Sequence, residues 1–341
     1  MKSRYFMRSL LIGIVLAVVL NFVTLPYYVT RPGDAQELRP LVSVEGGDED
    51  QGSFMLTTVK MGKANIFTYA FAKVSEYQNI FPINQIRAED ETDEEYNYRQ
   101  LHMMESSKET AIKIAYEKAG KEVELISKGV YVFSVKKGLA AEGKLDIGDR
   151  ITHIDGKETA TAEELMEVVG EKSIGDTIEL TFDRDEEEKT TSITLGEHPE
   201  DPNRAGLGIS LLTDYEITMD PPITINSAQI GGPSAGLMFS LEIYNQLLDE
   251  DISKGYDIAG TGAINEKGEV LRIGGISQKI VAADNSGVDI FFAPNEKGAE
   301  GSNYQEALVA AEDIKTSMKI VPVDTFEDAI EYLEQLETKS E

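Results

Sequence analysis

The hydrophobic pattern begins with one long apolar run close to the start of the chain. Residues 9–25 read SLLIGIVLAVVLNFVTL, and Lys2, Arg4 and Arg8 precede them without an acidic residue. With its flanks the run approaches the roughly 20 residues that a helix needs to cross a bilayer. The basic flank predicts a cytoplasmic N-terminus, with everything after about residue 30 outside the cell. The run is longer than a usual signal-peptide core and no Ala-x-Ala-like cleavage site follows it, so we expect a retained anchor rather than a cleaved signal peptide.

The polar and apolar positions that follow predict a mixture of strands and helices. Residues 31–52 start with Arg-Pro-Gly and end in an acidic stretch, which predicts an irregular loop. Residues 53–59 alternate and are rich in β-forming side chains, so we expect a strand there. Residues 66–80 are apolar at helical spacing. A long helix is predicted from Thr92 to Lys118, because Thr92 is a good N-cap and acidic residues follow it in the first turn.

Between residues 123 and 197 the pattern changes to short strands separated by turns. Strands are predicted at 130–135, 177–182 and 190–195, and a helix is predicted to start after Thr161. This pattern indicates a small β-rich domain with one helix.

This segment resembles a PDZ domain, most clearly in Gly-Lys-Leu-x-x-Gly-Asp-x-Ile-x-x-Ile-Asp-Gly at 143–156. The resemblance implies that an extended peptide joins the sheet beside one edge strand and a helix. The carboxylate-binding Gly-Leu-Gly-Phe loop of PDZ domains is expected at 127–131, where this chain reads Ser-Lys-Gly-Val-Tyr. A PDZ domain that only shields a site elsewhere in the chain is therefore the alternative. The candidate peptide-binding residues are Gly129, Val130, Tyr131 and Val132.

Two short segments in the last third of the chain carry candidate chemistry. Gly-Gly-Pro-Ser-Ala-Gly at 231–236 opens an apolar helix and places Ser234 on a glycine-rich turn. Backbone N–H groups and the positive end of the helix dipole at such a turn can hold a developing oxyanion. Lys279 lies on a second, predominantly apolar segment, where desolvation lowers the pKa of a lysine until it can serve as a base. Ser234 and Lys279 together predict a Ser-Lys dyad.

These two segments resemble the protease domain of the Lon family. The shared features are the Gly-Pro-Ser-Ala-Gly turn with its apolar helix, then Thr261-Gly262, then Ile273-Gly274-Gly275 ahead of Lys279. The resemblance implies that Ser234 is the nucleophile, Lys279 the general base and Thr261 the residue that orients the lysine.

The expected oxyanion hole consists of the backbone N–H groups of Gly232 and Ser234. Two positions depart from the Lon pattern. Gly231 stands where Lon proteases commonly carry an acidic residue, and Ala263 stands where they carry Glu. Both departures concern the surroundings of the predicted dyad.

Composition excludes several classes of function. The formal net charge of −29 leaves no basic face for nucleic acid, and no phosphate-loop motif occurs, so no nucleotide is expected and the ATPase of Lon itself is missing. The chain has no cysteine, which excludes disulfides and thiolate chemistry. None of its three histidines stands at metal-ligand spacing to another. We therefore expect neither a metal nor a cofactor.

The sequence thus predicts an α+β fold, in which a PDZ domain (a partly open β-barrel) is inserted in a Lon-type proteolytic domain behind one transmembrane helix. The expected divisions are a cytoplasmic tip and anchor at 1–30, the first part of the protease body at 31–122, the PDZ domain at 123–198, and the rest of the protease at 199–341, with a linker at 199–206.

The predicted function is that of an ATP-independent serine endopeptidase. We expect it to be held in the cell membrane by a single span, with its catalytic part extracellular and with exported peptides or envelope proteins as substrates. The PDZ domain would present substrate or gate the site, and the resemblance also implies a homo-oligomer. The alternative is a catalytically inactive PDZ adaptor that binds exposed C-termini of exported proteins.

Overall fold

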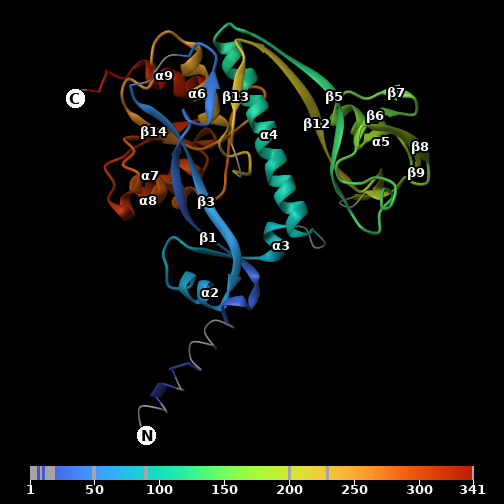
Figure 1. Cartoon of the computed structure of the whole chain (residues 1–341), viewed down its shortest axis with the longest axis horizontal. Helices are drawn as coiled ribbons and strands as arrows, with labels where there is room; N and C mark the ends of the chain where they lie inside the picture. The colour runs from blue at the N-terminus through green and yellow to red at the C-terminus, as the bar shows by residue number, and fades with distance from the viewer. Residues whose placement is uncertain are drawn as a thin grey trace.

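The computed structural model describes residues 6–7, 10–11, 20–47, 51–87, 91–198, 201–227 and 230–339. Two bodies, each with its own sheet and hydrophobic core, are joined by the long helix α4 and a two-stranded ribbon formed by β5 and β12 (Figure 1).

The larger body is built on a six-stranded mixed sheet. In spatial order its strands are β18 (Lys319–Val323), β17 (Ile290–Pro294), β14 (Asp257–Gly260), β3 (Ser53–Asn65), β1 (Thr24–Glu37) and β4 (Asn79–Pro82). The strands from β18 to β3 run parallel, whereas β1 is antiparallel to both β3 and β4. Strands that precede and follow the smaller body in the sequence therefore share one sheet, as expected for an inserted domain.

Helices cover both faces of this sheet. One face carries α4 (Asp93–Lys118), α6 (Gly236–Leu247) and α9 (Phe326–Glu334), and the other carries α7 (Ile276–Asn285) and α8 (Asn303–Ile314). Successive strand residues point to opposite faces, so Phe292 belongs to the first core and Phe291 to the second. Helix α6 is buried along its whole length, which fixes the turn at its N-terminus firmly in the core.

Helix α4 has the predicted bounds. The Thr92 side chain accepts a hydrogen bond from the backbone N–H of Glu95, while the Glu95 side chain accepts one from the N–H of Thr92. This capping box satisfies two N–H groups at the start of the helix, with acidic residues placed at the positive end of its dipole.

The smaller body is a sheet with one helix packed on it. In spatial order its strands are β12 (Ile209–Asp220), β5 (Glu122–Val135), β6 (Arg150–Ile154), β8 (Thr177–Arg184) and β9 (Glu187–Thr194), with β7 (Lys157–Glu158) beside β6. Helix α5 (Ala162–Gly170) starts after Thr161, as predicted, because the Thr161 hydroxyl caps it. The core between helix and sheet is formed mainly by aliphatic side chains, including Val130, Ile151, Leu165 and Leu180.

The remaining elements are short. Three are strand pairs: β2 (Val42–Val44) with β13 (Ile223–Ile225), β10 (Gly196–His198) with β11 (Asp201–Gly206), and β15 (Ala263–Ile264) with β16 (Val270–Leu271). The others are α2 (Ile66–Ala72), α3 (Ile83–Ile86) and a single 3₁₀ turn at Glu296–Gly298.

Three local predictions are wrong. Residues 31–37 are part of β1 rather than an irregular loop, because they pair with β3. The helix predicted at 66–80 ends at Ala72, and the chain then forms β4. Residues 201–206 form β11 rather than a linker, since Ala205 and Leu207 are buried in the core of the smaller body. The strand that follows belongs to the same sheet, so this body extends past the expected boundary at 198.

Most of the predicted anchor, including residues 12–19, lies outside the described residues. Among the residues that are described, no helix is long and apolar enough to cross a membrane. The predicted end of this segment at residue 30 is wrong, because β1 already starts at Thr24 and the side chains of Tyr28, Val29 and Thr30 are buried in the larger body.

Candidate active site

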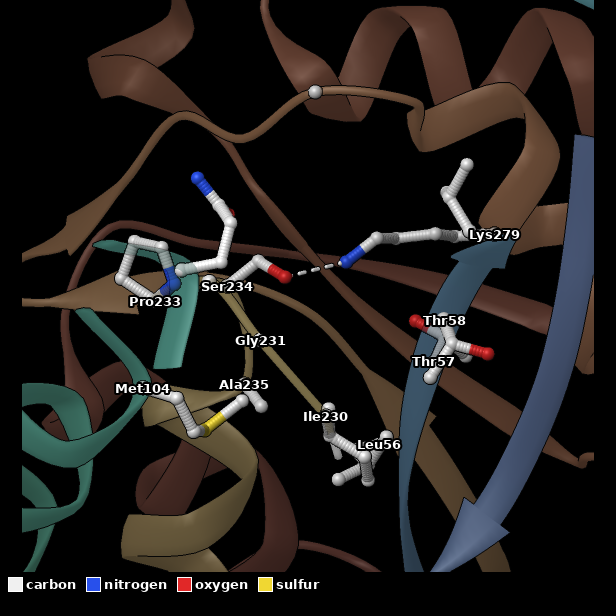
Figure 2. Close-up of a pocket in the computed structure, with 14 residues that line it drawn as sticks. Leu56, Thr57, Thr58, Met104, Ile230, Gly231, Pro233, Ser234, Ala235 and Lys279 are labelled. Carbon is white, nitrogen blue, oxygen red and sulfur yellow. Dashed lines mark hydrogen bonds between the residues drawn. The ribbon is translucent and has the colours of Figure 1, made fainter. Parts of the chain in front are cut away.

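The glycine-rich turn between β13 and α6 presents Ser234 at the start of a buried helix. In Figure 2, the Ser234 hydroxyl points across a pocket toward the end of the Lys279 side chain, which comes from α7. The two segments lie on opposite faces of the large sheet, and they meet beyond the end of β14.

Lys279 is held as a buried amine in contact with two hydroxyl groups. Its Nζ lies 2.8 Å from Ser234 Oγ and 2.8 Å from Thr261 Oγ1. The side chain is only 3% exposed. Burial lowers the pKa of Lys279 from 10.5 to about 7, because an ammonium group is poorly solvated there. A large fraction of the lysine is therefore neutral near pH 7 and able to accept a proton.

Thr261 connects the lysine to the backbone of the nucleophile. Its hydroxyl donates to the carbonyl oxygen of Ser234 at 2.9 Å, and the N–H of Gly262 donates to the same oxygen at 2.8 Å. A Cβ at Gly262 would lie 2.4 Å from the Val270 side chain, so this close approach requires glycine. The structure thus brings together Ser234, Thr261 and Lys279, the three residues predicted for the dyad and its orientation.

The predicted oxyanion hole is only partly available. The N–H of Gly232 donates to the backbone carbonyl of Gln100 on α4 at 2.8 Å, so in this conformation it does not face the reacting centre and this prediction is wrong. The N–H of Ser234 has no hydrogen-bond partner within the described residues. Of the two expected donors, the Ser234 N–H is unpaired among the described residues, whereas the Gly232 N–H is hydrogen-bonded to α4.

Three residues of α4 complete the site, and none of them could be identified from the sequence. Gln100 and Met104 line the pocket around Ser234 and Lys279. The Ser107 hydroxyl donates to the carbonyl oxygen of Pro233 at 3.0 Å. These residues lie far from the glycine-rich turn in the sequence, on a helix whose pattern indicates only helix formation.

The first departure from the Lon pattern has a structural explanation. A Cβ at Gly231 would lie 2.9 Å from Gln100 Cβ, so a larger side chain has no room there while α4 keeps its position. Burial alone lowers the pKa of Lys279, without a contribution from a nearby acidic group. Nothing in the structure explains the second departure, Ala263, which pairs with Leu271 in a short hairpin.

The pocket around the dyad has a volume of about 370 Å³. Apolar side chains form one wall of it, and Figure 2 shows Leu56, Met104 and Ile230 together on one side of the dyad. Residues 57–59 of β3 form another wall. The pairing of β3 with β14 ends at Leu56, so beyond this residue β3 has no strand partner on that side among the described residues.

The predicted peptide-binding strand of the smaller body is wrong. Gly129, Val130, Tyr131 and Val132 lie on β5, an inner strand that pairs with β12 on one side and β6 on the other. Val130 and Val132 are fully buried in the core. No edge is left at these residues for an added peptide strand.

A groove of the expected type lies on β12 instead. This strand ends the sheet, and with α5 it encloses a pocket of about 270 Å³ whose apolar wall includes Leu165, Met166 and Val169. Gly206-Leu207-Gly208-Ile209 leads into the strand and lines the same pocket. The expectation that a Gly-Leu-Gly-Phe-like loop was missing is therefore wrong. A similar segment, Gly-Leu-Gly-Ile at 206–209, is present in the sequence, but it follows β8 and β9 instead of preceding β5.

Among the described residues, no group of histidine and carboxylate side chains could hold a metal ion.

Comparison with known proteins assigns both bodies. Residues 222–335 match the model of the Lon protease (S16) C-terminal proteolytic domain, and residues 110–195 match that of a PDZ domain. The chain is 35% identical over 102 residues to the Lon protease of Campylobacter jejuni subsp. jejuni serotype O:2, covering 30% of this chain and 12% of that protein. It is 37% identical over 100 residues to the Lon protease of Campylobacter concisus, covering 29% of this chain and 11% of that protein. The chain thus spans only a small part of the length of these relatives.

Among solved structures, the PDZ domain of an SdrC-like protein from Listeria monocytogenes is 32% identical and covers 24% of this chain and 86% of that one, with a TM-score of 0.23. By the two family-model matches, the chain contains a PDZ domain and a Lon-type proteolytic domain.

Proposed function

We propose that this chain, a PDZ-containing member of the Lon protease-domain family, is an ATP-independent serine endopeptidase that uses Ser234 and Lys279 as a catalytic dyad. The observation that carries the proposal is the 2.8 Å contact between Ser234 Oγ and the Nζ of a buried lysine whose pKa is lowered to about 7. A hydroxyl beside a neutral amine in a buried site is an activated nucleophile.

The chemistry follows from this contact. Neutral Lys279 accepts the proton of the Ser234 hydroxyl while Oγ attacks the carbonyl carbon of a peptide bond. The oxyanion forms beside the N–H of Ser234, and one such donor contributes about 3–4 kcal/mol to the transition state. The Lys279 ammonium then gives its proton to the leaving amine. A water molecule, deprotonated by the same lysine, hydrolyses the acyl ester and restores the serine.

The walls of the pocket favour an extended substrate with an apolar residue near the cleaved bond. The unpaired edge of β3 at residues 57–59 offers backbone groups to a peptide strand beside Ser234. Ile230, together with the nearly buried Leu56 and Met104, makes one wall of the pocket apolar for one of its side chains.

The PDZ groove supports a role for the smaller domain in selecting or presenting substrates. A peptide that adds as a strand to β12 would lie between this strand and α5, with its end at Gly206–Ile209.

Helix α4 offers a physical route by which this domain could gate the site. On one side, Tyr98 and His102 contact Tyr131 of the PDZ domain through stacked rings and a hydrogen bond between the two tyrosine hydroxyls. On another side, the backbone carbonyl oxygen of Gln100 accepts a hydrogen bond from the N–H of Gly232. A displacement of α4 by the PDZ domain would therefore release a second oxyanion donor.

Membrane attachment and exported substrates are part of the same proposal. They rest on the apolar run at residues 9–25 with its basic flank, which predicts a cytoplasmic N-terminus and a catalytic part outside the cell.

The test is covalent labelling of the full chain with a fluorophosphonate, followed by mass spectrometry. An adduct on Ser234 that disappears in both Ser234→Ala and Lys279→Ala is expected. Lys108→Ala is the matched control, because Lys108 is another buried lysine but pairs with Glu105 on α4 instead of with the site. An adduct that survives Lys279→Ala would contradict the dyad. Absence of any adduct in the folded wild type would favour the adaptor that only binds C-termini.

A further inference from the structure

A cluster of exposed apolar side chains lies on α2, at the end of the larger body from which the N-terminal segment leaves (Figure 1). Phe67 is 46%, Phe71 61% and Val74 81% exposed. Their spacing places them along one side of the helix and the turn after it. Large apolar side chains that gather on a surface in this way mark a contact with another molecule or a membrane.

The charged side chains that line the hollow beside Phe67 and Phe71 are basic, although the chain as a whole carries a formal charge of −29 and the acidic Glu76 lies close to Val74. Phe67 and Phe71 share a hollow of about 430 Å³ with Arg31, Lys60 and Lys63. Acidic partners only partly neutralise these cations.

Two of the three basic side chains around the hollow form ion pairs. Lys60 pairs with Asp34 at 2.6 Å, and Lys63 pairs with Asp93 at 2.5 Å. Within the described part of the chain, Arg31 has no ion pair. The α2 face, meaning Phe67, Phe71 and Val74 with Arg31, Lys60 and Lys63, thus combines apolar and cationic side chains.

The α2 face is also continuous with the segment predicted to enter the membrane. Asn65 caps α2, and its side-chain amide donates to Asn21 Oδ1 at 3.0 Å. Phe22 and Val23, which directly follow Asn21, are exposed beside the start of β1. The chain therefore reaches the larger body at α2, and not at another part of its surface.

We infer that the α2 face lies on the surface of an anionic lipid bilayer, with Phe67, Phe71 and Val74 in the boundary between head groups and acyl chains. This inference rests on the membrane attachment proposed above. Aromatic side chains bind that boundary, and lysine and arginine side chains near an anionic surface are attracted to it. A second copy of the chain fits less well, because a two-fold contact would place the same basic side chains against one another.

The consequence is a fixed orientation of the peptidase. A tether at residues 9–23 alone would let the larger body rotate above the membrane. Contact through α2 as well would hold the larger body against the bilayer by a second attachment.

The absence of tryptophan from the chain gives a clean test. The full chain is prepared as Phe71→Trp, or as Val309→Trp for the control, since Val309 is 69% exposed on α8 and away from the α2 face. Each is placed in bilayer nanodiscs that contain phosphatidylglycerol and brominated phosphatidylcholine. We expect the emission of Phe71→Trp to shift to the blue and to be quenched at least twofold by the brominated lipid, while Val309→Trp is unchanged.

Each other result overturns the inference in a distinguishable way. A chain that co-purifies with the nanodiscs but shows no bromine quenching at Phe71→Trp refutes the α2 contact and leaves the anchor intact. A chain that does not co-purify with the nanodiscs refutes both the contact and the attachment, while Ser234 labelling still reports on the peptidase separately. A blue shift that depends on protein concentration and not on brominated lipid shows that a second copy covers the face.

Discussion

The backbone N–H of Gly232 donates to the carbonyl oxygen of Gln100, 2.8 Å away. This bond joins the nucleophile turn to a helix that also contacts the PDZ domain, and it removes one of two expected oxyanion donors from the site. We therefore expect that α4 must move away from the turn before the Gly232 N–H can act as an oxyanion donor.

Pushing α4 away from this turn should speed the enzyme. Gly231→Ala adds a Cβ 2.9 Å from Gln100 Cβ, so the turn and the helix must separate. We expect this variant to label Ser234 faster than the wild type, by up to about 100-fold, because the Gly232 N–H is released as an oxyanion donor. Gly274→Ala is the control, since Gly274 lines the same pocket and a Cβ there meets nothing within 4 Å. Equal rates for Gly231→Ala and the wild type would show that α4 need not move.

The rate of Ser234 labelling should rise with pH through about 7. The pKa of Lys279 is lowered to about 7 by burial, so the fraction of neutral base grows from pH 5.5 and levels off above pH 8. The measurement is the second-order rate constant of labelling between pH 5.5 and 10. A rate that still increases tenfold per pH unit above pH 9 would indicate a lysine with an ordinary pKa and would argue against this base.

Replacing the Thr261 hydroxyl should reduce turnover more than substrate binding. Thr261→Val keeps the shape but removes the acceptor for Lys279 Nζ and one of the two donors to the Ser234 carbonyl. We expect kcat to fall on the order of 10- to 100-fold with little change in KM. Thr159→Val provides a matched control, because Thr159 is a buried threonine of the PDZ domain. A change confined to KM would mean that Thr261 contacts substrate instead of positioning the dyad.

The buried lysine should cost stability. Its pKa falls from 10.5 to about 7 on folding, so between these values the unfolded chain binds one proton more and stability rises with pH. The loss of stability caused by burying the lysine is complete below about pH 7 and disappears near pH 10.5. It amounts to about 1.4 kcal/mol for each unit by which the pKa is lowered. Lys279→Met should therefore have a higher Tm than the wild type at pH 7, and the difference should shrink by pH 10. Thermal unfolding at both pH values checks this, and a difference independent of pH would point to packing instead.

Peptide binding by the PDZ domain should depend on α5 and β12, and not on β5. Met166→Glu puts a charge into the apolar groove between α5 and β12 and should weaken binding of a fluorescent peptide with an apolar free C-terminus by tenfold or more. Ile174→Glu is the control, since Ile174 is also an exposed apolar residue of this domain but does not line the groove. Fluorescence anisotropy of the full chain measures both. Equal affinities for the two variants would exclude this groove.

The chain sequence by itself determined the candidate chemistry and those elements that neighbouring residues specify. Ser234 and Lys279 could be identified because their chemistry needs particular residue types in particular local settings, a glycine-rich helix start and an apolar helix. The bounds of α4 followed from Thr92 and the acidic residues after it, because a helix cap is formed by neighbours in the sequence.

Only the tertiary structure decided which groups are free to act. Whether Gly232 has an available N–H depends on Gln100, and whether a PDZ strand is open to a peptide depends on which strand lies beside it. From the sequence, residues 129–132 of β5 are candidates for pairing with a peptide strand. In the fold, β12 pairs with these residues, so the exposed edge of the sheet is on β12. Hydrogen bonds between distant segments form only after the chain has packed, so no local pattern records them.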